Sequence, residues 1–221
     1  MKEEVEAGQV PLNIFFDFDG TLIDSRQRQY NLFCELLPDS RFSFADYWKI
    51  KRERVSQAEI LKRYCSFNDE QIKLFHASWM AQIEKSDRLM SDQPFSERIT
   101  DVLRKLSGKY ALYLVTARQN PLLVKEQLRR FGWSDCFENV LVTEQRNAKA
   151  DLIRQNVKTG KMDVIIGDTG EDIQAGKKLG IRTLAVTYGV LSKEVLMKYE
   201  PDSFVETPEG LLQYLKFWYG Q

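Results

Sequence analysis

Two aspartates that follow a short apolar stretch, Asp17 and Asp19, are the residues of this sequence best suited to chemistry. Residues 12–16 are largely apolar, rich in phenylalanine and bounded by polar residues, which predicts a buried strand. In an extended chain, residues two positions apart face the same side, so we expect both carboxylates to face one point while Phe18 faces away. Gly20 then allows a sharp turn and lets a bound group approach the backbone closely.

Two carboxylates held this close repel each other unless a cation or a proton compensates them. The Asp-x-Asp-Gly pattern also occurs in plain turns and in calcium-binding loops. A calcium loop is excluded here, because no acidic residue follows at the ligand spacing and the apolar pair of residues 22 and 23 comes instead. We therefore interpret the two aspartates as functional.

Two later apolar stretches also end in polar side chains. Residues 111–115 are followed by Thr116, and residues 164–166 are followed by Gly167, Asp168 and, four positions further on, Asp172. In an open parallel sheet the carboxyl ends of the strands form one edge, and ligands bind there at the topological switch point. Segments far apart in the sequence would thus place their polar side chains in one crevice.

Together these acidic residues, Asp17, Asp19, Asp168 and Asp172, would form a four-carboxylate pocket that needs a divalent cation. Acidic residues are also favoured at helix N-termini, and this would explain either of the last two alone. Ligation by oxygen alone, without histidine or thiolate, favours Mg²⁺ over zinc or copper. A Walker-type phosphate loop is excluded, since the glycine–lysine spacing after residue 170 is one residue too long and Lys178 stands where Ser or Thr is needed.

Residues 17–22, Asp-Phe-Asp-Gly-Thr-Leu, match the first motif of the haloacid dehalogenase-like hydrolases residue for residue. The later motifs of that family are similar in order and setting: an apolar strand ending in Thr116, then Lys149, then the Gly-Asp-Thr-Gly-Glu-Asp run of residues 167–172. Lys149 is the loosest match, and Arg146, Lys158 and Lys161 are its rivals. The chain most resembles the phosphoglycolate phosphatase-like branch of the family, whose helical cap of the C1 type emerges just after the first strand.

The resemblance implies phosphoryl transfer through a covalent aspartyl-phosphate. Asp17 would be the nucleophile, and Asp19 would protonate the leaving group and later take a proton from water. Thr116 and adjacent backbone N–H groups would bind phosphoryl oxygens, and Lys149 would neutralise the charge that builds up there. Family dehalogenases lack the second acid, so the carboxylate at position 19 disfavours carbon–halogen chemistry.

The resemblance also implies the metal ligands and the substrate contacts. Mg²⁺ would be held by an oxygen of Asp17, the backbone carbonyl of Asp19 and Asp168, with Asp172 nearby or acting through water. The substrate would meet Gly20, Thr21, Ala117 and Arg118 in the core. Residues 49–54 of the helical insert carry a cationic cluster of Lys49, Lys51, Arg52 and Arg54. We expect most of these side chains to be solvated on a helix surface, and Arg52 to be the one that reaches a substrate.

The spacing of apolar residues along the chain predicts the helices and strands that must position these residues. Residues 26–88 show helical spacing of apolar residues and no convincing strand, whereas strands and helices alternate from residue 95 onward. We expect an α/β fold with a Rossmann-like, mainly parallel sheet covered by helices on both faces. The core domain would comprise residues 1–24 and 91–221, and an inserted all-helical cap domain would comprise residues 25–90.

The composition is that of an ordinary globular chain of 221 residues, with 43% hydrophobic residues, 29% charged residues and a formal net charge of zero. No global basic field exists to attract nucleic acid or a membrane. The single histidine, His76, disfavours histidine-based triads and multi-histidine metal sites, so acid–base chemistry must rest on carboxylates or lysine. The cysteines, which show no metal-type spacing and suit a reducing cytoplasm, are Cys34, Cys65 and Cys136.

The sequence thus predicts a cytoplasmic, Mg²⁺-dependent phosphatase that hydrolyses a small phosphorylated metabolite, with neither nucleic acid nor membrane as a partner. A phosphomutase of the β-phosphoglucomutase type is the nearest alternative, because the same site can return the phosphoryl group to a sugar. A non-catalytic binding module of the same fold and a receiver-like domain phosphorylated on Asp17 are further alternatives. The identity of the substrate and the choice between monomer and dimer are left open.

Overall fold

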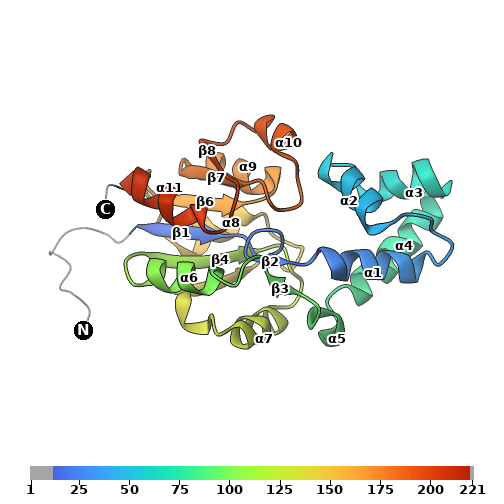
Figure 1. Ribbon diagram of the computed structural model, residues 1–221, viewed down its shortest axis with the longest axis horizontal. Coiled ribbons are helices and arrows are strands. Elements are labelled where there is room, and N and C mark those ends of the chain that lie inside the picture. Colours follow the sequence, from blue (N-terminus) through green and yellow to red (C-terminus); the bar gives the residue numbers. More distant parts are fainter. Residues whose placement is uncertain (1–11, 220–221) are drawn as a thin grey trace.

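The computed structural model describes residues 12–219, which form a parallel sheet with helices beside it (Figure 1). The six strands lie in the order β5-β4-β1-β6-β7-β8, and every neighbouring pair is parallel. Chain order reverses on the two sides of β1, so the end of β1 is the topological switch point. The prediction of a Rossmann-like α/β fold is confirmed. The strands are β1 Asn13–Phe16, β4 Ala111–Thr116, β5 Asn139–Val142, β6 Val164–Gly167, β7 Arg182–Val186 and β8 Ser203–Val205.

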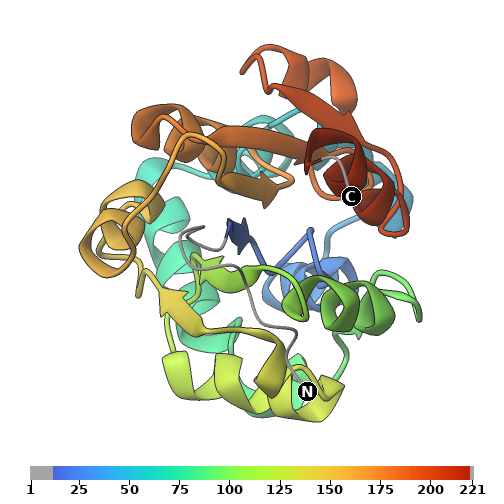
Figure 2. The same cartoon turned by 90° about the vertical axis from the view of Figure 1, so that its left-hand side faces the viewer.

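Side-chain alternation along β1 explains the layers. Ile14 and Phe16 pack on one face of the sheet with helices α6, α7 and α11, whereas Phe15 packs on the other face with α8 and α9. Figure 2 shows α6 and α11 on one side of the sheet and α8 and α9 on the other. Both faces of β1 are therefore buried, which explains its apolar sequence. These helices are α6 Ile99–Ser107, α7 Pro121–Phe131, α8 Lys149–Asn156, α9 Gly170–Leu179 and α11 Gly210–Tyr219.

The segment between β1 and α6 is helical and packs around a buried cluster of its own, which includes Phe33, Tyr47, Ile60 and Trp79. It lies beyond the carboxyl end of β1, to the right in Figure 1. Its helices are α1 Arg26–Leu36, α2 Phe44–Arg52, α3 Gln57–Cys65, α4 Asp69–Gln82 and α5 Ser86–Leu89. The expected helical character of residues 26–88 is thus observed.

The return to the core differs from expectation. Alternating helices and strands are expected from residue 95 onward, but the first helix of this part, α6, begins only at Ile99. The reason is that residues 93–95 are extended against the outgoing segment: β3 Gln93–Pro94 pairs antiparallel with β2 Ile23–Asp24, and the N–H of Phe95 donates to the carbonyl of Leu22 at 3.1 Å. The two crossings between the sheet and the helical segment are therefore joined side by side.

Local capping sets several helix ends that bear on the site. Asn120 accepts from the N–H groups of residues 122 and 123 at the start of α7, where Pro121 costs no hydrogen bond. Asn147 does not cap α8; Ala148 is the N-cap and makes no side-chain cap bond. The N–H of Asn147 instead donates to the carbonyl of Thr143, so the chain is still in a turn at that position.

Two short elements complete the described part, the 3₁₀ turn Ser134–Cys136 and α10 Lys193–Met197. Within residues 12–219, no helix combines the length and apolar character that a membrane crossing requires.

Candidate active site

The end of β1 carries an acidic side chain in close contact with a lysine from another element. The Nζ atom of Lys149, in the first turn of α8, lies 2.5 Å from Oδ1 of Asp17 and 2.6 Å from Oδ1 of Asp172 in α9. All three side chains are buried. Burial alone would lower the pKa of Lys149, but the two carboxylates outweigh it and raise that pKa, so the lysine is a fixed positive charge between two acids.

Asp172 also closes the N-terminus of α9. Its Oδ2 accepts from the N–H of Thr169 at 3.2 Å and from the hydroxyl of Thr169 at 2.6 Å. The expected helix-start role and the role at the site therefore coexist, because each oxygen of the carboxylate has its own partners.

Asp168 is fully buried beside these groups. Its Oδ2 accepts from the N–H of Val190 at 2.6 Å, and the hydroxyl of Thr21 lies 3.5 Å from its Oδ1. Two glycines make room for it: a Cβ on Gly20 would lie 2.1 Å from Oδ2 of Asp168, and a Cβ on Gly189 would lie 2.3 Å from its Cβ. Gly20 also has a φ of 84°, which side chains rarely adopt.

Three carboxylates therefore gather at the end of β1. Oxygen atoms of Asp17, Asp168 and Asp172 all lie within 4.8 Å of one another. Burial raises the pKa of Asp17 to about 7 and, together with the other two acids, raises the pKa of Asp168 well above its ordinary value. An all-oxygen donor set with excess negative charge fits a hard divalent cation.

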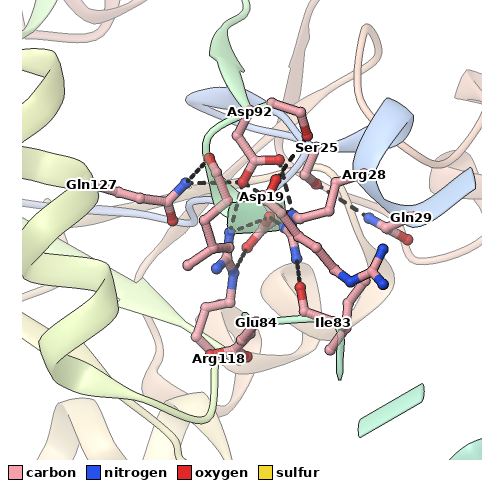
Figure 3. Close-up of polar contacts among 12 residues, drawn as sticks. Asp19, Ser25, Arg28, Gln29, Ile83, Glu84, Asp92, Arg118 and Gln127 are labelled. Carbon is pink, nitrogen blue, oxygen red and sulfur yellow. Dashed lines mark hydrogen bonds and ion pairs between the residues drawn. The ribbon is translucent and has the colours of Figure 1, made fainter. Parts of the chain in front are cut away.

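The fourth predicted member, Asp19, is placed differently (Figure 3). Its carboxylate lies between two arginines: Nη2 of Arg28 donates to Oδ1 at 2.6 Å, Nη2 of Arg118 donates to the same oxygen at 2.8 Å, and Nε of Arg118 donates to Oδ2. Burial acts in the opposite sense, but Arg118 and Arg28 hold the pKa of Asp19 well below its ordinary value.

Asp17 and Asp19 line the same cavity, but the carboxylate of Asp19 pairs with the two arginines and is not part of the group of three acids, so the expected four-carboxylate pocket is not formed. The strand ends at Phe16, so the alternation of an extended chain no longer holds at positions 17–19. Phe18, by contrast, does face away into the core as predicted.

A cavity of about 240 Å³ opens above the acidic group, between the sheet edge and the helical segment. The core contributes both candidate acids at positions 17 and 19, and α1 and α4 with their flanks contribute the facing wall. Its lining residues are Asp17, Asp19, Arg28, Gln29, Trp79, Met80, Ile83, Glu84, Thr116, Ala117, Arg118, Gln119, Gln145, Lys149, Thr169 and Glu171.

The remaining predicted contacts fall into two groups. Thr116, Ala117 and Arg118 line the cavity, whereas Gly20 and Thr21 pack against Asp168 and are not among its lining residues. Arg52, at the end of α2, donates from Nη1 to the carbonyl of Gly189 at 2.7 Å and from Nη2 to the carbonyl of Thr187 at 3.1 Å. In this structure Arg52 therefore joins the helical segment to the loop after β7.

Comparison with known proteins identifies the family to which a chain with this arrangement belongs. A family model described as haloacid dehalogenase-like hydrolase matches residues 14–186, which is most of the chain. The chain belongs to the haloacid dehalogenase-like hydrolases. The resemblance inferred from the motifs at the end of β1, β4 and β6 is therefore confirmed, and with it the classification as a hydrolase.

The curated relatives of this hydrolase are similar over nearly their whole length. Phosphoglycolate phosphatase of Synechococcus elongatus is 25% identical over 205 residues, covering 90% of this chain and 95% of the relative. Pyrophosphatase PpaX of Bacillus velezensis is 26% identical over 216 residues, covering 90% and 94%.

Among solved structures, the haloacid dehalogenase-like family protein SP0104 of Streptococcus pneumoniae is similar with a TM-score of 0.72 and 25% identity. The likeness covers 93% of this chain and 98% of that one. The fold shared with this member of the family thus extends over most of the chain.

Sequence reasoning did not find two residues near Asp19 in this haloacid dehalogenase-like hydrolase: Arg28, which pairs with Asp19, and Asp92, which pairs with Arg28. Arg28 lies in the polar first turn of α1, Asp92 lies in a polar stretch just after α5, and the chain has 32 basic and 32 acidic residues. No local pattern distinguishes these two from solvated charges. Only their burial, 3% exposure for the Arg28 side chain and 0% for Asp92, marks them as part of the site.

Proposed function

We propose that the protein is a Mg²⁺-dependent phosphatase that hydrolyses a small phosphorylated metabolite through an aspartyl-phosphate on Asp17. One observation carries the proposal: Asp17 lines the cavity, belongs to a buried group of three acids, and has the ammonium of Lys149 2.5 Å from its carboxylate. This combination offers a carboxylate nucleophile together with positive charge where phosphoryl oxygens gather.

In the first step, an oxygen of Asp17 would form a bond to phosphorus as the bond to the leaving oxygen breaks. Asp19, whose pKa is lowered by the two arginines, would have to gain a proton from solvent when the substrate binds. It would then give that proton to the leaving oxygen, so the product leaves as an alcohol. In the second step, Asp19 would take a proton from water as the water oxygen attacks phosphorus and the bond to Asp17 breaks. Orthophosphate is released, and both carboxylates return to their starting states.

The other residues would orient the phosphoryl group. Thr116 and the neighbouring backbone N–H groups at Ala117 and Arg118 would bind its oxygens, and Lys149 would neutralise the charge that develops on them. Asp17, Asp168 and Asp172, with the backbone carbonyl of Asp19, would hold Mg²⁺. When bound, Mg²⁺ would neutralise the acidic group and polarise the phosphate.

We further propose that residues 25–90 act as a cap domain over a core of residues 1–24 and 91–221. Helices α1 and α4 with their flanks line one side of the cavity. A rigid movement of this segment would therefore either open the site to water or exclude water from it. A substrate contact by Arg52 stays a prediction, and it would require the side chain to leave the carbonyls of residues 187 and 189.

The names of the curated relatives indicate which classes of substrate to test first. One is named a phosphoglycolate phosphatase and another a pyrophosphatase, so small anionic phosphates and pyrophosphate are the first compounds to test. The scattered cysteines support a cytoplasmic location.

The test is a panel of phosphorylated metabolites with Mg²⁺, in which released orthophosphate is measured. We expect release from at least one compound, loss of that release in Asp17→Asn, and retention of the folded state by circular dichroism. Phosphatase activity retained by Asp17→Asn would contradict the mechanism, and an isomerised sugar phosphate without free orthophosphate would indicate a mutase instead.

A further inference from the structure

A second carboxylate, Asp92, lies behind Asp19 and has no place in the mechanism above. It is fully buried, in the segment between α5 and β3 that returns from the helical segment to the core. A buried carboxylate is stable only when its oxygens are paired. The groups that pair with Asp92 therefore indicate which side chains it positions.

Three donors surround the carboxylate of Asp92, as Figure 3 shows. Nε of Arg28 donates to its two oxygens at 2.9 and 3.1 Å, Nη2 of Arg118 lies 3.3 Å from Oδ2, and Nε2 of Gln127 donates to Oδ2 at 2.9 Å. Arg28, Arg118 and Gln127 come from α1, the loop after β4 and α7. Asp92 thus joins three separate elements at the place where the chain re-enters the core.

The two arginines that touch Asp92 are the two that hold Asp19. Arg28 uses Nε for Asp92, Nη2 for Asp19 and Nη1 for the carbonyl of Ile83 at 2.9 Å. Every nitrogen of this guanidinium has a partner, so its plane is fixed. Arg118 reaches both carboxylates through the single atom Nη2.

The two carboxylates are not equivalent. The Asp19 side chain is 23% exposed and lines the cavity, whereas Asp92 is 0% exposed and does not line it. Asp19 can therefore meet a substrate and Asp92 cannot. Two positive and two negative groups leave the set neutral, so each arginine is shared between a carboxylate at the site and a supporting one.

We propose that Asp92 is a positioning residue for proton transfer by Asp19, acting through Arg28 and Arg118. The inference rests on the proposed phosphatase function. Replacing Asp92 by asparagine would present an amide N–H to donors that already need acceptors, so both arginines would shift and carry the Asp19 carboxylate with them. A displacement of about 1 Å of a catalytic group can lower the rate about a hundredfold.

The test compares two substrates of the full-length protein with Mg²⁺: 2-phosphoglycolate, or the best alkyl phosphate of the panel, and p-nitrophenyl phosphate. Only the alkyl alkoxide needs a proton as it leaves. We expect Asp92→Asn to lower kcat/KM for the alkyl phosphate by about tenfold to a hundredfold, with a change of less than about threefold for p-nitrophenyl phosphate. A merely structural role would lower both values by the same factor, and that result would overturn the inference.

A double variant tests the route through Asp19. In the Asp19→Asn background, Asp92→Asn should change kcat/KM for the alkyl phosphate by less than about threefold, because the group that it positions is already lost. A further loss of tenfold or more would contradict the proposal.

Asp163→Asn is the matched control. Asp163 is also buried and paired, accepting from the N–H of Asn13 at 3.0 Å and from its Nδ2 at 2.8 Å, but it lies at the amino end of β1 and β6, away from the site. This variant should lose stability without changing the ratio of the two kcat/KM values. If Asp92→Asn does not fold, Gln127→Met removes one donor to Asp92 and should shift the ratio in the same direction by about fivefold; an unchanged ratio there would count against the inference.

The outcomes separate the two proposals. If the wild-type protein releases phosphate but the ratio of the two kcat/KM values is unchanged in the Asp92 variants, this inference alone is overturned. Absence of phosphate release by the wild-type protein from every compound would overturn the proposed function, and this inference with it.

Discussion

The Nζ atom of Lys149 lies 2.5 Å from Oδ1 of Asp17, and both side chains are almost completely buried. This pair joins the first turn of α8 to the end of β1, across 132 positions of sequence. The lysine also contacts Asp172, so one ammonium balances two of the three gathered acids. Removing the lysine would leave both of these buried carboxylates without their counter-charge.

Lys149→Met should therefore affect both activity and stability. We expect phosphatase activity to fall by about a hundredfold or more, because a donor to the charged transition state is lost. Without metal, the free energy of unfolding should fall by about 3–5 kcal/mol, as for other broken buried pairs. Urea unfolding in EDTA measures the second effect. Lys178→Met is the control, since Lys178 pairs with Asp151 at the surface and should be close to neutral. Equal behaviour of the two variants would contradict the role of the pair.

The pH dependence of stability should report the burial of Asp17. The folded protein raises its pKa from 3.8 to about 7, chiefly by burial, which the ammonium of Lys149 offsets only in part. An acid with a higher pKa in the folded state than in the unfolded state destabilises the fold once pH exceeds the unfolded value, and the cost grows until pH passes the folded value.

Asp17→Asn removes this cost. In EDTA, the Tm of the variant minus that of the wild type should therefore rise as pH increases from about 4 to about 7, and should level off above that range. Scanning calorimetry across this range measures the difference. A difference that is constant with pH would show that Asp17 titrates normally.

Gly189→Ala should disturb Asp168 without touching the cavity lining. A Cβ at this position would lie 2.3 Å from the Cβ of Asp168 and 2.3 Å from the carbonyl oxygen of Gly20. We expect a loss of about 1–3 kcal/mol of stability from overpacking and a higher Mg²⁺ concentration for half-maximal activity. Gly160→Ala, where a Cβ would meet open space, is the control. Unchanged activation by Mg²⁺ in the Gly189 variant would argue against Asp168 as a ligand.

Mg²⁺ should stabilise the folded protein, because binding only to the folded state shifts the equilibrium toward it. At a hundred times its Kd the expected gain is about 2.7 kcal/mol. Asp168→Asn should abolish most of this gain, since it removes one of the three acids that lie within 4.8 Å of one another. Thermal unfolding with MgCl₂, against KCl of equal ionic strength, tests this. A gain of the same size in the variant would exclude the proposed ion site.

The sequence alone determined the order of the elements and the position of most chemical groups along them. Apolar runs predicted strands of the sheet. In the structure Asp17 and Asp168 each directly follow a strand, and Thr116 is the last residue of one, so all three lie at carboxyl ends. These signals are local, because burial of a strand and the turn that follows it are set by a few adjacent residues. Parallel connection then places all such ends at one edge of the sheet.

Tertiary structure decided which of these groups meet. The sequence predicted four acids around one point, but Asp19 turns to Arg28 and Arg118 while Asp17, Asp168 and Asp172 stay together. The partners of a charge can come from any element that packs nearby, here from the helical segment and the loop after β4. Burial then makes such pairing compulsory, because an unpaired charge away from water is too unfavourable to persist.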